Sequence, residues 1–476
     1  MPLCPVSFLP SRATAWVEEG TSVLAASRAA GLTFDAPCGG RGVCGTCGVR
    51  VIEGELGEPD EQERAGLKRA PSGVRLACRS QVVGPVVVRP LVAPAAMSAE
   101  ISGGGRAALV AGVDLGTTNV SVVVVDRATG RQIGMATVPN RQRSFGADVI
   151  TRITAALGGD AAALSVAASE SVASALEVAS GGQAENVQRV VIAANTAMAA
   201  LLVQADVSVL SVAPYAAPVI PSSMEASKIR GLDSEAEVML VPPLGSFVGG
   251  DVLAGLEFLA AAGADSPVLL VDVGTNAEVA LLVGDNLTVA SAAAGPAFEG
   301  VAGLCGSEVV AALADLRRAD ILDEDGLIRP DGVGVSLDEN GVRVVSVGPE
   351  EDALLTQLDI RELQLAKAAV FVAVQGVLSA AALSAQSLSR VWVAGAFGGA
   401  LRPADLVAIG MMPVEVGQVL SAPGNASLGG ATKLALSGDL GAVRGYLQQA
   451  HHVGLASDPR FAERLLDAVR LAPQHL

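Results

Sequence analysis

Continuous apolar runs that end at an aspartate recur along the chain. One run, Ala108–Val113, ends at Asp114, and a second run, Val268–Val271, ends at Asp272, 158 residues later. Each is followed by a Gly-Thr turn and a returning apolar run. Uninterrupted apolar runs of this length are typical of strands that are buried on both faces. The repetition predicts duplicated α/β lobes that face each other across a cleft.

The first ninety residues have shorter runs that alternate between apolar and polar positions, which predicts a small α+β unit. We expect a hairpin, one helix capped by Thr21 and two further short strands. In chain order these elements are Val6–Pro10, Ala13–Val17, the helix Ser22–Ala30, Val49–Ile52 and Val86–Val88.

Between Leu91 and Arg106 the composition changes to Pro, Ala and Ser and ends in three consecutive glycines. Such a stretch predicts a flexible linker, which we place at 93–107. The linker separates a domain at 1–92 from two lobes at 108–265 and 266–476. A hinge with a function and a simple fusion joint would give the same composition.

Four cysteines suggest the chemistry of the first domain: Cys38, Cys44 and Cys47 share one loop, and Cys78 lies thirty-one residues further on. This spacing is typical of a plant- or adrenodoxin-type [2Fe–2S] cluster. Zinc is the alternative, but structural zinc sites usually combine two C-x2-C arms, and only one is present. The loop also matches G-x-G-x-x-G over Gly40–Gly45, but it opens no helix after a strand, so we reject a dinucleotide site there.

Charge and histidine content exclude several functions. The net charge is −17, and residues 1–92 (10 Lys/Arg, 9 Asp/Glu, net +1) leave −18 for the remainder, which argues against nucleic acid or an anionic membrane as a partner. The three histidines all lie near the C-terminus, which excludes a Rieske cluster, a zinc hydrolase site or a Ser-His-Asp triad in the body of the chain.

We expect a cytoplasmic protein without a membrane span. No secretory signal is visible at the N-terminus, and the apolar stretch Leu365–Ser384 contains Lys367 and Gln375, which favours a buried helix. Cys4 and Cys305 are predicted to be free thiols in a reducing compartment.

The two Asp-x-Gly-Thr turns are suited to phosphate. Backbone N–H and hydroxyl groups of such turns bind anionic oxygens, and Asp114 and Asp272 would lie where hydrated Mg²⁺ needs carboxylates. No P-loop motif occurs. A third glycine-rich turn follows the apolar run Val391–Ala394 and would let an adenosine approach the backbone. The predicted binding residues are Gly116, Thr117, Thr118, Gly274, Thr275, Asn276, Gly395 and Gly398.

These motifs together resemble the phosphate and adenosine motifs of the superfamily that unites acetate and sugar kinases, heat-shock chaperone ATPases and actin. With the N-terminal cluster motif, the chain more narrowly resembles the reductive activators of corrinoid proteins, from about Val6 to about Gly445. Further agreement lies in the stretches Ala194–Met198, Gly245–Asp251, Ala294–Gly300, Asp359–Lys367 and Asn425–Leu428.

The resemblance implies a multidomain chain, with a ferredoxin-like (β-grasp) domain followed by a two-lobed actin-like ATPase. It implies an enzyme that uses ATP and Mg²⁺ to pass an electron from a [2Fe–2S] cluster to Co(II) of a corrinoid (cobalamin-binding) protein, which regenerates Co(I) for methyl transfer. The partners would be that protein and a low-potential electron donor; homodimer formation stays open. Some members carry an extra middle domain before the first phosphate motif, where this chain has only the linker.

Several single residues have two interpretations. Asp251 could position the attacking water or bind Mg²⁺, or merely cap a helix, and Glu299 could contact ribose or be a surface residue. Lys367 either faces the adenosine or extends its stem towards solvent. Trp392 and Phe397 are expected in the core.

Other classes of protein would share some of these motifs. A ferredoxin fused to a kinase would show both motif sets, and so would an ATP-dependent activator of another low-potential metalloenzyme. Activators of double-cubane dehydratases use a [4Fe–4S] cluster, which the ligand spacing disfavours. A pure electron-transfer module is disfavoured because both phosphate turns are intact.

Overall fold

The structure is a computed structural model that describes residues 3–9, 13–30, 32, 42, 47–67, 74–90, 98–101, 108–260, 266–274, 276–298, 301, 304, 306–338, 341–347, 353–395 and 401–476. The chain clusters into two compact units. Unit 1 comprises Met1–Leu109, Leu115–Gln188 and Ala197–Val238, and unit 2 comprises Val110–Asp114, Arg189–Thr196 and Met239–Leu476.

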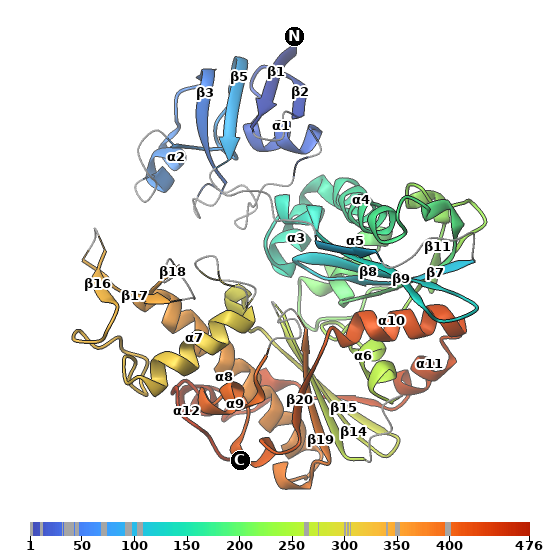
Figure 1. The fold of residues 1–476 in the computed structure, drawn as a ribbon, viewed down its shortest axis with the longest axis vertical. Helices are drawn as coiled ribbons and strands as arrows, with labels where there is room; N and C mark the ends of the chain where they lie inside the picture. Colours follow the sequence, from blue (N-terminus) through green and yellow to red (C-terminus); the bar gives the residue numbers. More distant parts are fainter. Residues whose placement is uncertain are drawn as a thin grey trace. The chain divides into compact units, whose positions relative to one another are not determined.

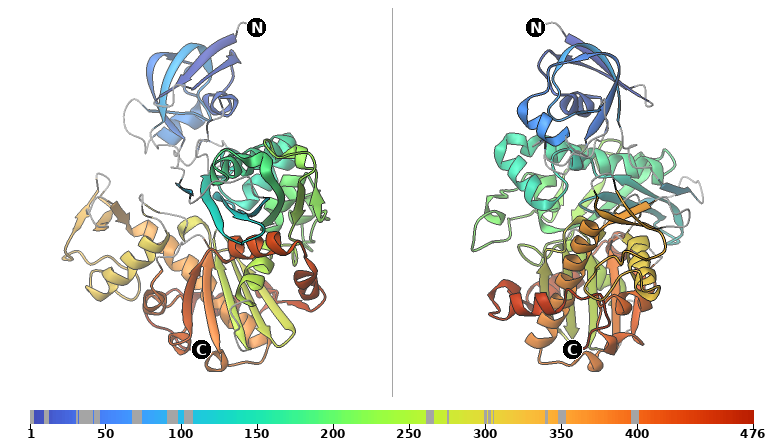
Figure 2. Two further views of the ribbon diagram at one scale, coloured as in Figure 1. Left: turned by 45° about the vertical axis from the view of Figure 1, so that its right-hand side comes forward. Right: turned by 90° about the vertical axis from the view of Figure 1, so that its left-hand side faces the viewer.

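Unit 1 begins with a five-stranded sheet in the order β2-β1-β5-β3-β4, drawn in blue in Figure 1 and Figure 2. The predicted hairpin is confirmed, because β1 and β2 pair antiparallel. The elements are β1 (Leu3–Phe8), β2 (Ala13–Glu18), α1 (Val23–Ala29), β3 (Gly48–Leu56), α2 (Glu61–Gly66), β4 (Val74–Leu76) and β5 (Val82–Pro90).

One capping prediction is wrong. Ser22, not Thr21, caps α1, and its hydroxyl accepts a hydrogen bond of 3.1 Å from the N–H of Ala25. The backbone of Thr21 is already engaged, since its carbonyl oxygen accepts from the N–H of Val82. The residue that enters the helix is therefore the next one along the chain.

The rest of unit 1 contains strands and helices that follow the predicted linker. They are β6 (Ser98–Ile101), β8 (Asn119–Asp126), β9 (Gln132–Pro139), α3 (Val149–Ala155), α4 (Ala161–Ala179), most of α5 (Thr196–Val203) and β11 (Ser223–Met224). Strand β6 lies inside the segment expected to be flexible and pairs antiparallel with β9, so that segment is partly ordered. Apolar and polar composition alone did not reveal this edge strand.

A seven-stranded sheet has the order β11-β12-β10-β7-β8-β9-β6. Its remaining strands are β7 (Leu109–Leu115), β10 (Val187–Ala194) and β12 (Glu237–Leu240). Strand β7 contains the apolar run that precedes Asp114. Its first five residues are buried, as the continuous apolar pattern predicted.

Unit 2 is built on a six-stranded sheet in the order β20-β19-β13-β14-β15-β21, and a three-stranded sheet of β16-β17-β18 accompanies it. The strands are β13 (Val268–Val273), β14 (Ala277–Val283), β15 (Asn286–Ala292), β16 (Val335–Leu337), β17 (Arg343–Val347), β18 (Ala353–Thr356), β19 (Arg390–Gly395), β20 (Leu420–Gly424) and β21 (Ala450–His452). The helices are α6 (Gly250–Ala260), α7 (Gly306–Arg318), α8 (Gln357–Ala380), α9 (Pro403–Ala408), α10 (Ala426–Ser437), α11 (Gly441–Leu447) and α12 (Phe461–Asp467).

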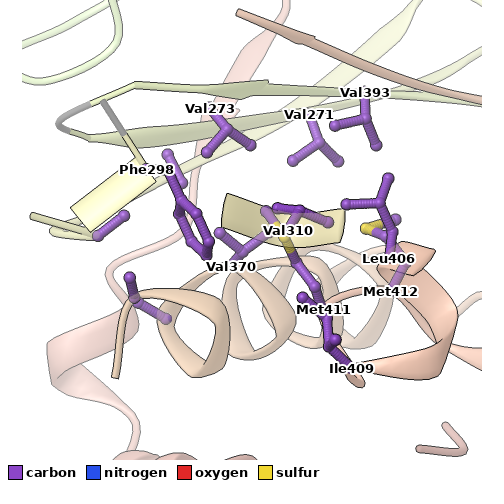
Figure 3. Packing of buried hydrophobic residues seen from close by; sticks show 14 of the residues in the cluster. Val271, Val273, Phe298, Val310, Val370, Val393, Leu406, Ile409, Met411 and Met412 are labelled. Atoms are coloured by element: carbon purple, nitrogen blue, oxygen red, sulfur yellow. The ribbon is translucent and has the colours of Figure 1, made fainter. Parts of the chain in front are cut away.

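The two faces of this sheet pack against different helices. One face, with Val271, Val273 and Val393, packs against α7 and α8, and Figure 3 shows these side chains above Val310 and Val370. The other face packs against α6 through residues that include Leu270, Trp392, Val252 and Leu256. Because side chains alternate along a strand, Asp272 belongs to the α6 face.

Among the described residues, two helical stretches are long and apolar enough to cross a membrane by length and composition alone. The first, Val149–Ala179, is interrupted at Gly159, whose φ is 109°. The second is α8, and 78% of its most apolar window is buried inside the protein. Helix α8 is therefore a core helix, as its sequence predicted.

Candidate functional site

Two of the four predicted cluster ligands are described, and their sulfurs lie together. The Sγ atoms of Cys47 and Cys78 are 3.4 Å apart, and Cys47 is buried. A disulfide would place them about 2.05 Å apart. Two thiolates at the observed separation can share one tetrahedral metal ion, for which metal–sulfur distances are about 2.3 Å. This geometry fits the proposed cluster; Cys38 and Cys44 lie outside the described residues.

A buried carboxylate holds the turn that carries Cys78. Glu63, on α2, accepts hydrogen bonds of 2.9 Å from the N–H of Leu76 and the hydroxyl of Ser80, and it pairs with Arg75. Burial by itself raises the pKa of Glu63, but these bonds outweigh it and hold the pKa below its usual value. The residues on both sides of Cys78 are thus tied to one ionised side chain.

In unit 2, Asp114 is the penultimate residue of β7 and receives two hydrogen bonds from the start of α10. The Nδ2 of Asn425 donates to Oδ2 over 2.7 Å, and the hydroxyl of Ser427 donates to Oδ1 over 3.1 Å. Burial raises the pKa of Asp114, and the two donors oppose that effect. Asn425 also caps α10, since its Oδ1 accepts from the N–H of Leu428.

Asp272 and Glu278 are direct partners across the β13–β14 pair. Residues in register on adjacent strands point to the same face of the sheet, so the two carboxylates are neighbours. Glu278 is 94% buried, because its exposed fraction is 6%. Burial, Asp251 and then Asp272 raise the pKa of Glu278 well above its usual value.

The backbone of Gly395 lies against Asp272. A Cβ added to Gly395 would lie 2.6 Å from Oδ1 of Asp272 and 2.2 Å from the carbonyl oxygen of Val273, and the φ of this glycine is 109°. No other residue type fits this position without displacing the carboxylate. Gly398, the other predicted glycine of this turn, lies outside the described residues.

Asp251 lies in the first turn of α6 and completes a group of four carboxylates. Burial and then Asp114 raise the pKa of Asp251 to about 7. Burial, Asp251 and Asp114 raise that of Asp272. Asp114, Asp251, Asp272 and Glu278 thus act on one another from the ends of β7, α6, β13 and β14. Mutual repulsion of this kind is relieved by protons or by a bound cation.

The four carboxylates are better suited to the Mg²⁺ of a bound nucleotide than to a metal ion held by protein side chains alone. Within the described residues, no three carboxylate, Cys or His side chains converge closely enough to enclose a metal ion. Mg²⁺ usually binds one or two carboxylates and completes its shell with water and phosphate oxygens.

The first turn predicted to bind phosphate, Gly116–Thr118, belongs to unit 1 and is fixed through its carbonyl oxygens. The Nδ2 of Asn140 donates to the carbonyl of Gly116 over 2.8 Å, and the buried Arg152 donates to that of Thr117 over 2.6 Å. The N–H of Asn140 donates to the carbonyl of Thr118. The turn therefore has a fixed backbone.

In the second turn, the N–H of Gly274 donates to the carbonyl oxygen of Asn276 over 2.8 Å, which closes it tightly between β13 and β14. Thr275 lies outside the described residues. The structure therefore shows the tight hairpin that the sequence predicted.

Lys367 corrects one interpretation. Its side chain is completely buried on α8, so it does not extend towards solvent. Its Nζ donates to the carbonyl oxygens of Arg470 and Gly410, which ties α8 to the C-terminal segment, and burial lowers the pKa to about 7. Trp392 lies in the core, as expected. Glu299, Cys305 and Phe397 lie outside the described residues.

Three residues of the site carried no role in the sequence prediction: Glu278, Asn425 and Ser427. Glu278 could have been found, because a three-residue turn between Val273 and Ala277 places it opposite Asp272. Asn425 and Ser427 are more than 300 positions from Asp114, and no local pattern predicts that contact.

Known family models cover the same parts of the chain. A "2Fe-2S iron-sulfur cluster binding domain" matches residues 8–83, the "RACo middle region" matches 109–261, and the "C-terminal domain of RACo the ASKHA domain" matches 266–302 and 301–476. ASKHA denotes the acetate and sugar kinase, chaperone and actin superfamily. The matched middle region includes the first Asp-x-Gly-Thr turn and coincides with the predicted first lobe, 108–265.

Two individual proteins are similar to this chain in sequence, and the names of both refer to corrinoid proteins. The chain is 28% identical over 411 residues to the "Corrinoid activation enzyme RamQ" of Eubacterium limosum, covering 74% of this chain and 68% of that one. It is 44% identical over 70 residues to the "[Co(II) methylated amine-specific corrinoid protein] reductase" of Methanosarcina barkeri, covering 14% and 12%.

A solved "Reductive activator for corrinoid,iron-sulfur protein" has the same fold, with a TM-score of 0.69 over 99% of this chain and 98% of that one, at 23% identity. The chain therefore belongs to the RACo family, in which a [2Fe–2S] ferredoxin-like domain is joined to a middle region and a C-terminal ASKHA domain.

Proposed function

We propose that the protein is an ATP-dependent reductive activator that returns the Co(II) form of a corrinoid protein to Co(I) for methyl transfer. Both curated relatives carry names that describe action on corrinoid proteins. The observation that carries the proposal is the presence, in one chain, of a paired Cys47–Cys78 site and of four carboxylates whose pKa values are raised by burial and by one another in an ASKHA fold. One supports electron transfer and the other supports nucleotide chemistry.

Cys38, Cys44, Cys47 and Cys78 would hold the [2Fe–2S] cluster, which supplies a single low-potential electron when bound. A low-potential donor protein would reduce it. The protein contributes the ligands, the short helix that anchors Glu63, and a hydrophobic shell around Cys47. Burial and hydrogen bonding of this kind tune the potential of an iron–sulfur centre.

Asp114 and Asp272 would bind Mg²⁺ of Mg·ATP, and Gly116–Thr118 and Gly274–Asn276 would bind the phosphates. Gly395 would leave room for the nucleotide beside Asp272. For Asp251 we propose that the carboxylate orients the attacking water. Its Oδ1 accepts from the adjacent Val252 N–H, and Asp251 is the second residue of α6, so it is not the residue that precedes and caps the helix.

ATP is needed because reduction of Co(II) to Co(I) is uphill even from a centre near about −400 mV. Binding of nucleotide can favour one arrangement of a two-lobed protein by a coupling free energy of about 1–3 kcal/mol, and hydrolysis can add to it. The difference in nucleotide affinity between the two arrangements, and not the ferredoxin-like domain alone, would make electron transfer to cobalt favourable.

The test is Co(I) formation by the full-length protein, followed by the absorption of a Co(II) corrinoid protein from a methyltransferase system, with a low-potential donor. We expect Co(I) only when Mg·ATP is present. Asp272→Asn should form no Co(I) even with Mg·ATP, and it should keep the visible spectrum of the iron–sulfur cluster. Cys47→Ala should lose the cluster and keep nucleotide binding. Equal Co(I) formation with and without ATP would reject the proposal.

A ferredoxin-fused kinase is the alternative, and the same assay distinguishes it. A kinase would convert ATP in the presence of a small hydroxylated or carboxylated substrate and release a phosphorylated product. An activator would release inorganic phosphate and require the corrinoid protein.

A further inference from the structure

The loop Leu244–Gly249, which precedes α6, carries Asp251 into the carboxylate group and is held from two sides. On one side the hydroxyl of Thr196 donates to the carbonyl oxygen of Gly245 over 2.6 Å and to that of Val248 over 3.2 Å. Within the loop, the N–H of Gly245 donates to the carbonyl oxygen of Val248. The hydroxyl of Thr196 thus binds the same two residues that this backbone bond joins.

His452 provides the contact on the other side. Its Nε2 lies 3.0 Å from the carbonyl oxygen of Leu244. A carbonyl oxygen only accepts, so Nε2 carries the proton and donates. The imidazole also lies directly on Gly245, where an added Cβ would come within 2.5 Å of Cε1. Gly245 thus leaves room for the ring.

His452 itself is placed by the main sheet of unit 2. It ends β21, a parallel edge strand of β15, where it pairs with Val289. The next N–H, of Val453, donates to the carbonyl oxygen of Val289 over 2.8 Å. The imidazole thereby connects the edge of the sheet to a loop more than 200 positions earlier in the sequence.

The end of the loop has little freedom to compensate for a lost contact. An added Cβ on Gly249 would lie 2.3 Å from Cα of Asn195, and one on Gly250 would lie 2.3 Å from the carbonyl oxygen of Val241. A shift of Leu244 is therefore transmitted along a closely packed backbone to Asp251. Misplacement of a catalytic group by about 1 Å can cost about a hundredfold in rate.

We propose that His452 is a positioning residue for Asp251, which it aligns through the hydrogen bond to Leu244 and the contact with Gly245. The proposal rests on the proposed function, in which Asp251 orients the water that attacks ATP. His452 itself does not contact nucleotide in this scheme. Its loss should lower kcat for ATP hydrolysis more than it raises KM for Mg·ATP.

The variants are His452→Ala, His452→Gln and His451→Ala, all made in the full-length protein. His452→Gln keeps an N–H donor at the reach of Nε2. His451 is the matched control, because it is the neighbouring histidine on the same strand and is exposed, as His452 is. We expect kcat to fall about tenfold in His452→Ala, to recover to within about threefold in His452→Gln, and to stay unchanged in His451→Ala, with the unfolding midpoint of all three within 2 °C or so of the parent.

Amide hydrogen exchange of peptides that span 242–252, with no nucleotide present, gives a readout that is independent of activity. Exchange should be faster in His452→Ala only, and His452→Gln should restore protection. Unchanged exchange and kcat in His452→Ala, or equal losses in His452→Ala and His452→Gln, would overturn the proposal. If the parent protein hydrolyses no ATP, the proposed function fails, and the exchange result still decides whether His452 holds the loop.

Discussion

The carboxylate of Asp114 is bound by the side-chain amide of Asn425, over 2.7 Å, across 311 positions of the sequence. The same asparagine caps α10. One side chain therefore both starts a helix and fixes the rotamer of a carboxylate that we assign to Mg²⁺.

Asn425→Asp separates these two tasks. The aspartate can still cap α10, but it places a second carboxylate beside Asp114, so we expect an approximately tenfold or greater loss of Mg²⁺-dependent ATP hydrolysis with little loss of stability. Asn425→Ala should instead cost about 1 kcal/mol of unfolding free energy from the lost cap. Phosphate release at varied Mg²⁺ and urea unfolding measure the two effects, and an unchanged Mg²⁺ dependence in Asn425→Asp would contradict the assignment of Asp114.

Gly395→Ala should displace Asp272. The methyl group would overlap with Oδ1 of Asp272 and with the backbone of Val273, and the positive φ adds strain of about 1–3 kcal/mol. We expect Mg·ATP binding, measured by calorimetry, to be lost or to weaken at least about tenfold.

Gly284→Ala is the matched control for that substitution. Gly284 also has a positive φ, in the β14–β15 turn, but an added Cβ meets no atom within 4 Å. It should therefore lose stability through strain alone and bind nucleotide normally. Equal binding losses in both variants would show that strain, not the contact with Asp272, is responsible.

Glu63→Gln should weaken retention of the cluster. It removes the charge that Arg75 pairs with and weakens the bonds to Leu76 and Ser80, on both sides of Cys78. Because the pKa of Glu63 is lowered in the folded state, its stabilisation is present above the unfolded pKa, near 4.5, and disappears as the pH falls through the folded pKa.

We therefore expect the visible absorption of the parent protein to bleach at a lower pH than that of Glu63→Gln, in anaerobic acid titration. Glu61→Gln is the control, since Glu61 is exposed on the same helix. Identical bleaching curves for the parent and Glu63→Gln would be evidence against the anchoring role of Glu63.

Cys47→Ala should abolish the cluster, because the sulfur atoms of Cys47 and Cys78 lie close enough to bind the same iron ion. Cys4→Ala is the control: Cys4 is a buried free thiol on β1. Iron and sulfide analysis should give about two of each per chain in Cys4→Ala and the parent, by the four-thiolate ligation. Stoichiometric zinc in the anaerobically purified parent would reject the iron–sulfur assignment.

Because Lys367 is buried in unit 2, the unfolding free energy should depend on pH between about 7 and 10.5. Burial lowers its pKa from 10.5 to about 7, so between these values the unfolded chain holds a proton that the folded protein has released. The unfolding free energy therefore rises with pH across this window, by up to about 1.4 kcal/mol per pH unit. Below about pH 7 the lysine is protonated in both states, and its full destabilising effect is present.

Lys367→Met should flatten this rise in unfolding free energy between pH 7 and 10, measured by urea titration. The absolute stability of the variant also reflects the lost bonds to Arg470 and Gly410, so the slope is the decisive quantity. Lys433→Met, which removes a partly exposed lysine paired with Glu257, should keep the parent slope.

The sequence by itself determined the chemistry and the strand–turn–strand frame. Runs without polar positions favour strands buried on both faces, so the runs ending at Asp114 and Asp272 became interior strands, and the two carboxylates lie where these strands meet the turns that follow. The thiolate spacing likewise restricts the metal, because a short loop can wrap a cluster only with that arrangement of ligands. These features depend on neighbours in sequence.

The tertiary structure decided what depends on distant neighbours. It paired Asn425 with Asp114, turned Lys367 inwards to two carbonyl oxygens, and brought His452 onto Gly245. It also made a strand of Ser98–Ile101 in a segment of linker-like composition. A hydrogen bond or a close packing contact depends on the position of two atoms, and only the packed sheet and helices fix that position when the residues are hundreds of positions apart.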